Sequence, residues 1–154
     1  MKRILEKGIG KRSDHDLNFL STYLKYNDFF FNLISMKDSS TIEQCFRNMQ
    51  IEYHPKFTFV FHFGQKGEKF YILLNGEAKV MIPKENSANK EETNIQNMIE
   101  IKLLNIGSSF GELALFNNKP RTASVYTTQD CYFAVLKKKD FKQIEFSPED
   151  ASRT

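Results

Sequence analysis

The sequence predicts a mainly β domain, a β-roll or jelly roll, with helices flanking it at both ends. Three observations support this prediction. From Ile51 the hydrophobic period is two, short apolar runs then recur between glycine-bearing or polar turns as far as Leu136, and the segments on either side have a helical period. With 154 residues, of which 40% are hydrophobic and 27% charged, the chain has room for one globular domain.

The segments before the strands predict a lead and two helices. Residues 1–12 are basic and lack a strong period, so we expect a flexible lead. Residues 13–26 are expected to be helical, because Ser13 can cap the helix and leucines recur at helical spacing behind it. The sequence of residues 40–43 is a capping box that begins a second helix, ending near residue 49. The apolar run 29–31 between the helices is expected to be buried.

The strands follow from Ile51. Residues 57–63 alternate phenylalanine with other side chains, and Asn75 with Gly76 forms a hairpin signal between two further strands. The polar stretch 84–96 predicts a long hairpin loop. We expect one domain over 13–146, with helices in 13–49, the β-roll in 51–136, a short helix in 140–146 and a tail in 147–154; the strands around the hairpin and after it are 71–74, 79–82, 99–104, 123–128 and 131–136.

Composition and charge exclude several classes of function. No apolar run approaches the roughly 18 residues of a membrane span, and we expect no secretory signal, because a charge stands near the N-terminus where its apolar region should be. A net charge of +3 with scattered lysines gives no argument for nucleic-acid binding, and the run 137–139 is expected to be a solvated face. The two cysteines, Cys45 and Cys131, lie in apolar patterns. We therefore expect buried free thiols and a cytoplasmic protein.

Residues 110–125 carry the groups that would recognise a cyclic phosphodiester. Arg121 offers paired N–H groups that match two phosphate oxygens. Glu112, as an acceptor, suits a ribose hydroxyl. Gly111 allows close backbone approach, and residues 113–115 can form a helical turn whose N–H groups point at the anion. Together these groups predict a small-molecule site for an anionic nucleotide.

The block Phe110-Gly-Glu-Leu-Ala-Leu115, followed by Pro120-Arg-Thr-Ala123, closely resembles the phosphate-binding cassette of the cyclic nucleotide-binding domain family. The resemblance covers roughly residues 17–144. It implies the β-roll of that family, with Glu112 on the ribose 2′-hydroxyl and Arg121 on the cyclic phosphate. The ligand-binding residues that it implies are Gly111, Glu112, Leu113, Ala114, Arg121, Thr122 and Ala123.

The resemblance also bears on the ligand and the partner. A hydroxyl residue after the arginine is associated in that family with guanine-preferring sites, so Thr122 favours cyclic GMP over cyclic AMP; a threonine on any exposed strand explains it equally well. Family members continue into a longer lid helix, whereas Ser147 and Pro148 should end the last helix here, so we expect no lid within this chain. The output would then reside in a partner, such as a kinase catalytic subunit or another signalling protein.

Catalytic and metal-dependent functions find little support in the sequence. The three histidines, His15, His54 and His62, lack a metal-like spacing to Cys, Asp or Glu, and no nucleophile has a recognisable base motif. We therefore expect a regulatory sensor that is not an enzyme, with no cofactor and no metal. Two alternatives remain, a ligand-free interaction module that keeps the roll and, more remotely, a metal-dependent jelly-roll enzyme.

Overall fold

The computed structural model describes residues 1–24, 27, 30, 39–84 and 94–145. Its centre consists of two antiparallel four-stranded sheets. The first sheet has the order β1 (Gln50–His54), β8 (Cys131–Lys137), β3 (Lys69–Asn75) and β6 (Ser109–Phe110). The second has the order β2 (Phe59–Phe61), β7 (Ser124–Thr127), β4 (Ala78–Pro83) and β5 (Met98–Leu104). The predicted mainly β roll is confirmed.

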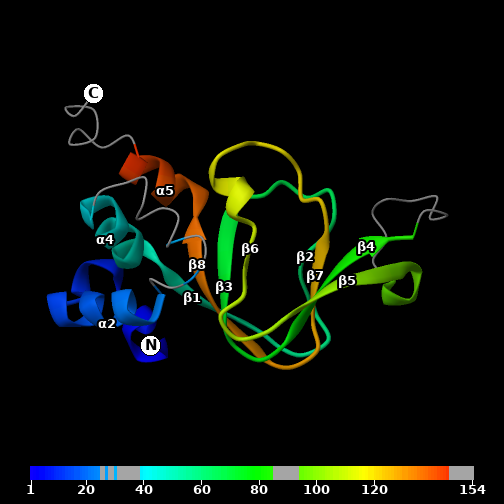
Figure 1. Ribbon diagram of the computed structural model, residues 1–154, viewed down its shortest axis with the longest axis horizontal. Helices are drawn as coiled ribbons and strands as arrows, with labels where there is room; N and C mark the ends of the chain where they lie inside the picture. The colour runs from blue at the N-terminus through cyan, green and yellow to red at the C-terminus, as the bar shows by residue number, and fades with distance from the viewer. Residues whose placement is uncertain (25–26, 28–29, 31–38, 85–93, 146–154) are drawn as a thin grey trace.

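The α-helices form a layer beside the first sheet, on the left of Figure 1, and the second sheet lies on the right. These helices are α1 (Lys2–Glu6), α2 (Asp14–Leu24), α4 (Ser39–Asn48) and α5 (Lys138–Glu145). Three short 3₁₀ turns complete the described elements: η1 (Ile9–Lys11), η2 (Ile95–Asn97) and η3 (Glu112–Leu115).

The two central strands of the first sheet, β8 and β3, are buried on both faces, which explains why they read as continuous apolar runs. Along β8, Phe133 and Val135 point into the core between the two sheets, whereas Ala134 and Leu136 point into the core under the helices. This alternation is the period of two expected of a strand. The first sheet therefore belongs to two hydrophobic cores and connects them rigidly.

The first twelve residues are folded, contrary to the flexible lead expected from the sequence. Leu5 of α1 is buried, and Arg12 is only 4% exposed. The Arg12 guanidinium donates to the carbonyl oxygens of Phe46 and Arg47 at 2.8 Å and of Leu5 at 3.1 Å. The prediction failed because two of the Arg12 partners, Phe46 and Arg47, lie 34 and 35 residues away in sequence and come near it only in the folded chain.

Of the two predicted helix caps, the one at Ser13 forms and the capping box at residues 40–43 does not. Ser13 precedes α2, and its hydroxyl accepts a hydrogen bond from the Asp16 N–H at 3.1 Å, as a cap should. By contrast, α4 begins at Ser39, so Ser40 lies inside the first turn, and Glu43 contacts the Arg47 guanidinium at 2.9 Å. In the run 29–31, Phe30 is fully buried, whereas residues 29 and 31 lie outside the described residues.

Two predictions about the strands were wrong. The run 57–63 forms a strand only at Phe59–Phe61, because Phe57 adopts a φ of 62° and is 62% exposed. Asn75 and Gly76 do not close a hairpin: β3 and β4 belong to different sheets, so this turn carries the chain from one sheet to the other. A β-carbon on Gly76 would lie 2.3 Å from the Asp130 carbonyl oxygen, which explains the glycine without a hairpin.

The polar stretch after β4 connects two strands that do pair, since Pro83 is opposite Met98 in the β4–β5 ladder; residues 85–93 of this loop lie outside the described residues. The last helix begins at Lys138, two residues earlier than predicted, and residues 146–154 also lie outside the described residues. The run 137–139 is not simply a solvated face. Lys138 is buried, and its ammonium donates to the carbonyl oxygen of Asn117 at 2.6 Å.

Candidate functional site

A cavity of about 280 Å³ lies over η3 and the segment that enters β7. The seven residues predicted as ligand-binding all line it, so the fold brings both halves of the motif to one place. Their exposure differs: Glu112, Leu113 and Thr122 are exposed, Gly111, Arg121 and Ala123 are half-buried, and Ala114 is buried. The exposed members face solvent, and the buried one forms part of the wall of the cavity.

Gly111 is required at its position for two independent reasons. It has a φ of +82°, a left-handed conformation that side chains with a β-carbon rarely adopt. A β-carbon there would also lie 2.6 Å from Nη1 of Arg121 and 3.0 Å from the carbonyl oxygen of Lys69. Gly111 is the N-cap residue that precedes η3, and its carbonyl oxygen accepts a hydrogen bond from the Ala114 N–H at 3.1 Å. The two N–H groups before Ala114 have no partner within the turn, as at any helical N-terminus.

Arg121 is fixed on three sides. Its Nη2 donates to the Lys69 carbonyl oxygen at 2.6 Å, and its Cζ lies 4.1 Å from the centroid of the Phe61 ring. Its own backbone N–H donates to the Gln65 carbonyl oxygen at 2.7 Å, and its carbonyl accepts from the Gly64 N–H at 2.8 Å. The guanidinium is therefore oriented before any ligand arrives.

The charge of Arg121 has no partner of opposite sign in the described part of the chain. Among those residues, no carboxylate lies within ion-pair distance of the guanidinium, and Glu112 forms neither an ion pair nor a hydrogen bond. Desolvation by burial lowers the pKa of Arg121, an effect that the neighbouring Tyr71 partly offsets. The group remains a cation at neutral pH because an arginine pKa is so high. A half-buried cation without a counter-charge is suited to an anionic ligand.

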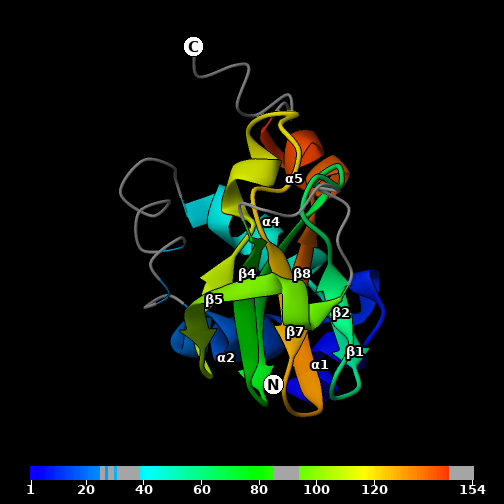
Figure 2. The ribbon, with the colours of Figure 1, turned by 90° about the vertical axis from the view of Figure 1, so that its right-hand side faces the viewer.

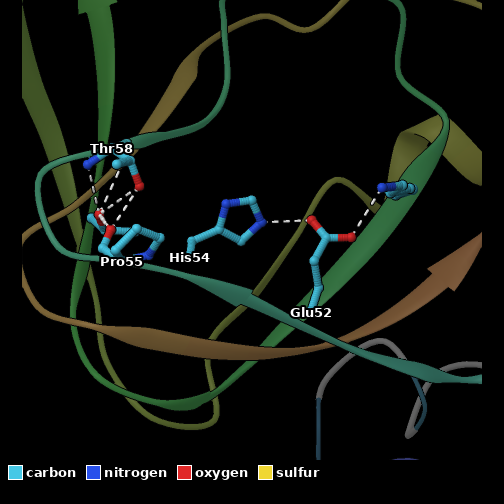
Figure 3. Close-up of polar contacts among 6 residues, drawn as sticks. Glu52, His54, Pro55 and Thr58 are labelled. Carbon is cyan, nitrogen blue, oxygen red and sulfur yellow. Dashed lines mark hydrogen bonds and ion pairs between the residues drawn. The ribbon is translucent and has the colours of Figure 1, made fainter.

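Lys69 connects this site to a polar cluster on β1. Its ammonium lies 2.9 Å from one Glu52 carboxylate oxygen, and His54 Nε2 lies 2.6 Å from the other. Figure 3 shows the Glu52 carboxylate next to the His54 ring, with a dashed line joining the two side chains. Burial raises the pKa of Glu52, but the hydrogen bonds of His54 and Lys69 outweigh that effect, so the net pKa is lowered. The side chain of Lys69 is thus held by β1 while its carbonyl holds Arg121.

Sequence reasoning missed the apolar part of the site. Phe61, Val80, Phe110 and Val125 line the cavity beside the polar groups and provide a surface for a flat or apolar part of a ligand. Gly67 also lines it, and a β-carbon there would lie 2.9 Å from that of Ala114. The period-two pattern placed Phe61 in a strand, but nothing in the sequence indicated which strands face the motif.

Neither a metal cluster nor a membrane-spanning helix is found in the described part of the chain. Within it, no group of three or more His, Cys, Asp or Glu side chains could hold a metal ion. No helix among the described residues is long and apolar enough to cross a membrane.

The geometry of the site agrees with a comparison against protein families. The sequence model described as the cyclic nucleotide-binding domain matches residues 51–146. This range contains the whole cavity and both sheets, except for Gln50, the first residue of β1. The chain belongs to this family. In this cyclic nucleotide-binding domain, the cavity around Arg121 is lined mostly by residues of the segment 110–123.

Curated relatives and a solved structure extend the comparison. The chain is 40% identical over 81 residues to a cAMP-dependent protein kinase regulatory subunit of Mucor circinelloides. The aligned region covers 53% of this chain and 17% of the relative. The chain is 28% identical over 142 residues to human Rap guanine nucleotide exchange factor 3, covering 91% of this chain and 14% of the relative. This cyclic nucleotide-binding domain therefore spans less than a fifth of either relative. The regulatory domain of Toxoplasma gondii PKA with cAMP shares the fold, with a TM-score of 0.65, 24% identity and coverage of 90% of this chain and 50% of that one.

Proposed function

We propose that this regulatory domain binds the cyclic phosphate of a cyclic nucleotide through Arg121 and the N–H groups at the beginning of η3. The observation that carries the proposal is the Arg121 guanidinium, which is half-buried and held by Lys69 and Phe61 without a carboxylate partner in the described residues. A cyclic phosphodiester would supply the missing negative charge in the bidentate geometry that arginine favours.

The remaining cavity residues take the other parts of the nucleotide. Glu112 is exposed at the rim and unpaired within the described chain, so it is free to accept a hydrogen bond from the ribose 2′-hydroxyl. Phe61, Val80 and Val125 offer the apolar surface against which the sugar and base would pack. Thr122 lies exposed beside Arg121, where its hydroxyl can reach the ligand.

The choice between cyclic AMP and cyclic GMP depends on two opposing observations. Thr122 favours cyclic GMP, whereas the kinase regulatory subunits among the relatives are named for cyclic AMP. Because the two ligands share the phosphate and ribose, the difference must come from contacts to the base. Thr122→Val, which replaces the hydroxyl by a methyl group of similar size, should reduce the affinity for cyclic GMP and leave that for cyclic AMP unchanged if threonine reads the guanine edge.

We further propose that α5 carries the response to a protein partner. The Phe116 ring, directly after η3, lies 5.4 Å from the Phe141 ring of α5, and the Lys138 ammonium donates to Asn117 at 2.6 Å. A ligand that fixes η3 would therefore favour one position of α5. The relatives suggest a kinase catalytic subunit or another signalling protein as the partner that reads this position, in which case this chain itself is not an enzyme.

The buried thiols support a reducing compartment such as the cytoplasm. Cys45 and Cys131 are both free and buried, and burial raises the pKa of Cys45 to about 12, which keeps it unreactive.

Calorimetric titration of the purified chain with cyclic AMP and cyclic GMP tests the proposal. The Arg121→Ala variant should weaken binding by about 2–5 kcal/mol, because the phosphate loses its buried charge partner. Arg3→Ala is the matched control, since Arg3 is exposed on α1 and does not line the cavity. Equal affinities for the Arg121→Ala variant and the wild type would refute the phosphate role. No binding of either nucleotide at millimolar concentration would favour the ligand-free interaction module.

A further inference from the structure

A second cavity, of about 490 Å³, lies between α5, the end of β8 and the segment before β3. We call it the basic cavity. Among the described residues that line it, Glu68 is the only carboxylate, and Asn118 is the only uncharged residue. The other residues are lysines: Lys66, Lys69, Lys137, Lys138, Lys139 and Lys142.

The fold concentrates these lysines at one concave place. Residues 137–139 mark the passage from β8 into α5, and Lys142 follows Lys138 one helical turn later on the same face. Lys66 arrives from another segment, where its backbone pairs with Pro120 in an isolated bridge. In both views, α5 lies beside the segment that contains η3 and the following loop (Figures 1 and 2). Like charges at this spacing repel one another, which is unfavourable for folding in the absence of an anion.

Most of these ammonium groups are available to a ligand. Lys69 is occupied by Glu52 at 2.9 Å, and Lys138 donates to Asn117 at 2.6 Å. The ammonium groups of Lys137, Lys139 and Lys142 have no ion pair or hydrogen bond within the described part of the chain. That of Lys66 has only an exposed, weak contact with Glu68 at 3.7 Å.

The electrostatic environment of Lys138 agrees with a surplus of positive charge. Desolvation by burial lowers its pKa, and the neighbouring Lys142 and Lys66 lower it further, while Glu68 acts in the opposite direction. A bound anion would relieve the repulsion among these groups. The basic cavity therefore has both the shape and the charge of an anion-binding site.

We propose that the basic cavity binds a ligand carrying clustered phosphate groups, separately from the cavity around Arg121. Lysine binds phosphate as a compact point charge, and several lysines on different elements suit several phosphates at different positions. The volume is larger than that of the Arg121 cavity, which favours a polyphosphate over a single phosphate. The inference does not rest on the proposed nucleotide function.

Titration of the whole chain with inorganic tripolyphosphate, compared with orthophosphate at the same ionic strength, tests this proposal. Tripolyphosphate should bind saturably and more tightly. The double variant Lys139→Gln, Lys142→Gln should weaken its binding about tenfold, since two exposed charge contacts are lost. Both lysines are exposed, so the variant should fold, which circular dichroism would verify. The control Lys84→Gln, Lys102→Gln makes the same change in net charge at exposed lysines outside both cavities and should bind as the wild type does.

Two further experiments test which cavity binds the anion and whether the phosphate belongs to a lipid or to a soluble ligand. Arg121→Ala should retain tripolyphosphate binding, whereas its loss would place the anion in the first cavity and overturn the proposal. Sedimentation with vesicles that contain a phosphatidylinositol bisphosphate, beside titration with inositol hexakisphosphate, distinguishes a lipid headgroup from a soluble ligand, and binding in either arm supports the site. Absent or non-saturable tripolyphosphate binding, or equal weakening in the control double variant, would overturn it.

Discussion

Replacement of Gly111 by alanine tests whether backbone geometry or steric contact makes this glycine necessary. The φ of +82° alone costs a residue with a β-carbon about 1–2 kcal/mol. Gly107 has a φ of +92°, but a β-carbon there would meet nothing within 4 Å, so Gly107→Ala incurs the backbone cost alone. In Gly111→Ala, the β-carbon would in addition lie 2.6 Å from Arg121 Nη1 and 3.0 Å from Lys69 O. The gain from a less flexible unfolded chain is similar in both variants and cancels between them.

The comparison yields a measurable difference in both stability and binding. Gly107→Ala should lower the melting temperature by about 2–4 °C for each kcal/mol of unfolding free energy that is lost, and should leave the nucleotide affinity unchanged. Gly111→Ala should lower it further and should also weaken nucleotide binding, because Arg121 must leave its contact with Lys69. Differential scanning calorimetry and titration calorimetry measure the two effects. Equal melting temperatures in the two variants, with wild-type affinity in Gly111→Ala, would refute the steric argument.

Three further outcomes are expected. Phe61→Ala should weaken nucleotide binding by about 1–2 kcal/mol, because the ring under the Arg121 guanidinium is lost. Phe57→Ala, at an exposed ring outside the cavity, should leave the affinity unchanged. Equal affinities of the two variants in calorimetric titration would contradict this. Arg12→Ala should lower the free energy of unfolding by about 2–3 kcal/mol, because buried carbonyl groups lose a charged donor, and urea denaturation at neutral pH should show that loss with nucleotide affinity preserved. Because the pKa of Glu52 is lowered by folding, its contribution to stability is present above the unfolded pKa and is lost as the pH falls through the folded pKa. Between about pH 6 and pH 3, urea denaturation should therefore show a smaller loss of unfolding free energy in Glu52→Gln than in the wild type. Equal losses in the two proteins would contradict this.

Local patterns in the sequence were sufficient for the fold class and for the seven predicted residues in 111–123 that line the cavity, but not for its apolar wall. Strand periodicity depends on neighbouring residues, and β5, β7 and β8 lie where it placed them. The cassette residues are close together in sequence, so their meeting needs only one loop and one turn. Their individual roles toward a ligand remain predictions.

Other features depend on contacts between distant segments and could not be read from local patterns. The turn at Asn75 and Gly76 has the signature of a hairpin, yet whether β4 pairs with β3 or crosses to the other sheet is decided by the packing of β7 and β5 against β4. Likewise, Lys138 sits in a basic run that looks solvated, but the loop after η3 folds over it and supplies oxygen acceptors.

The sequence by itself determined the mainly β class, the flanking helices and the cassette, because each depends on the spacing of residues along a short segment. Only the tertiary structure decided that residues 1–12 fold around Arg12, that Lys69 and Phe61 orient Arg121, and that lysines from separate segments share one cavity. The physical reason is that a charged side chain acquires its neighbours, and hence its energy, from segments that the chain brings together only when its hydrophobic cores form.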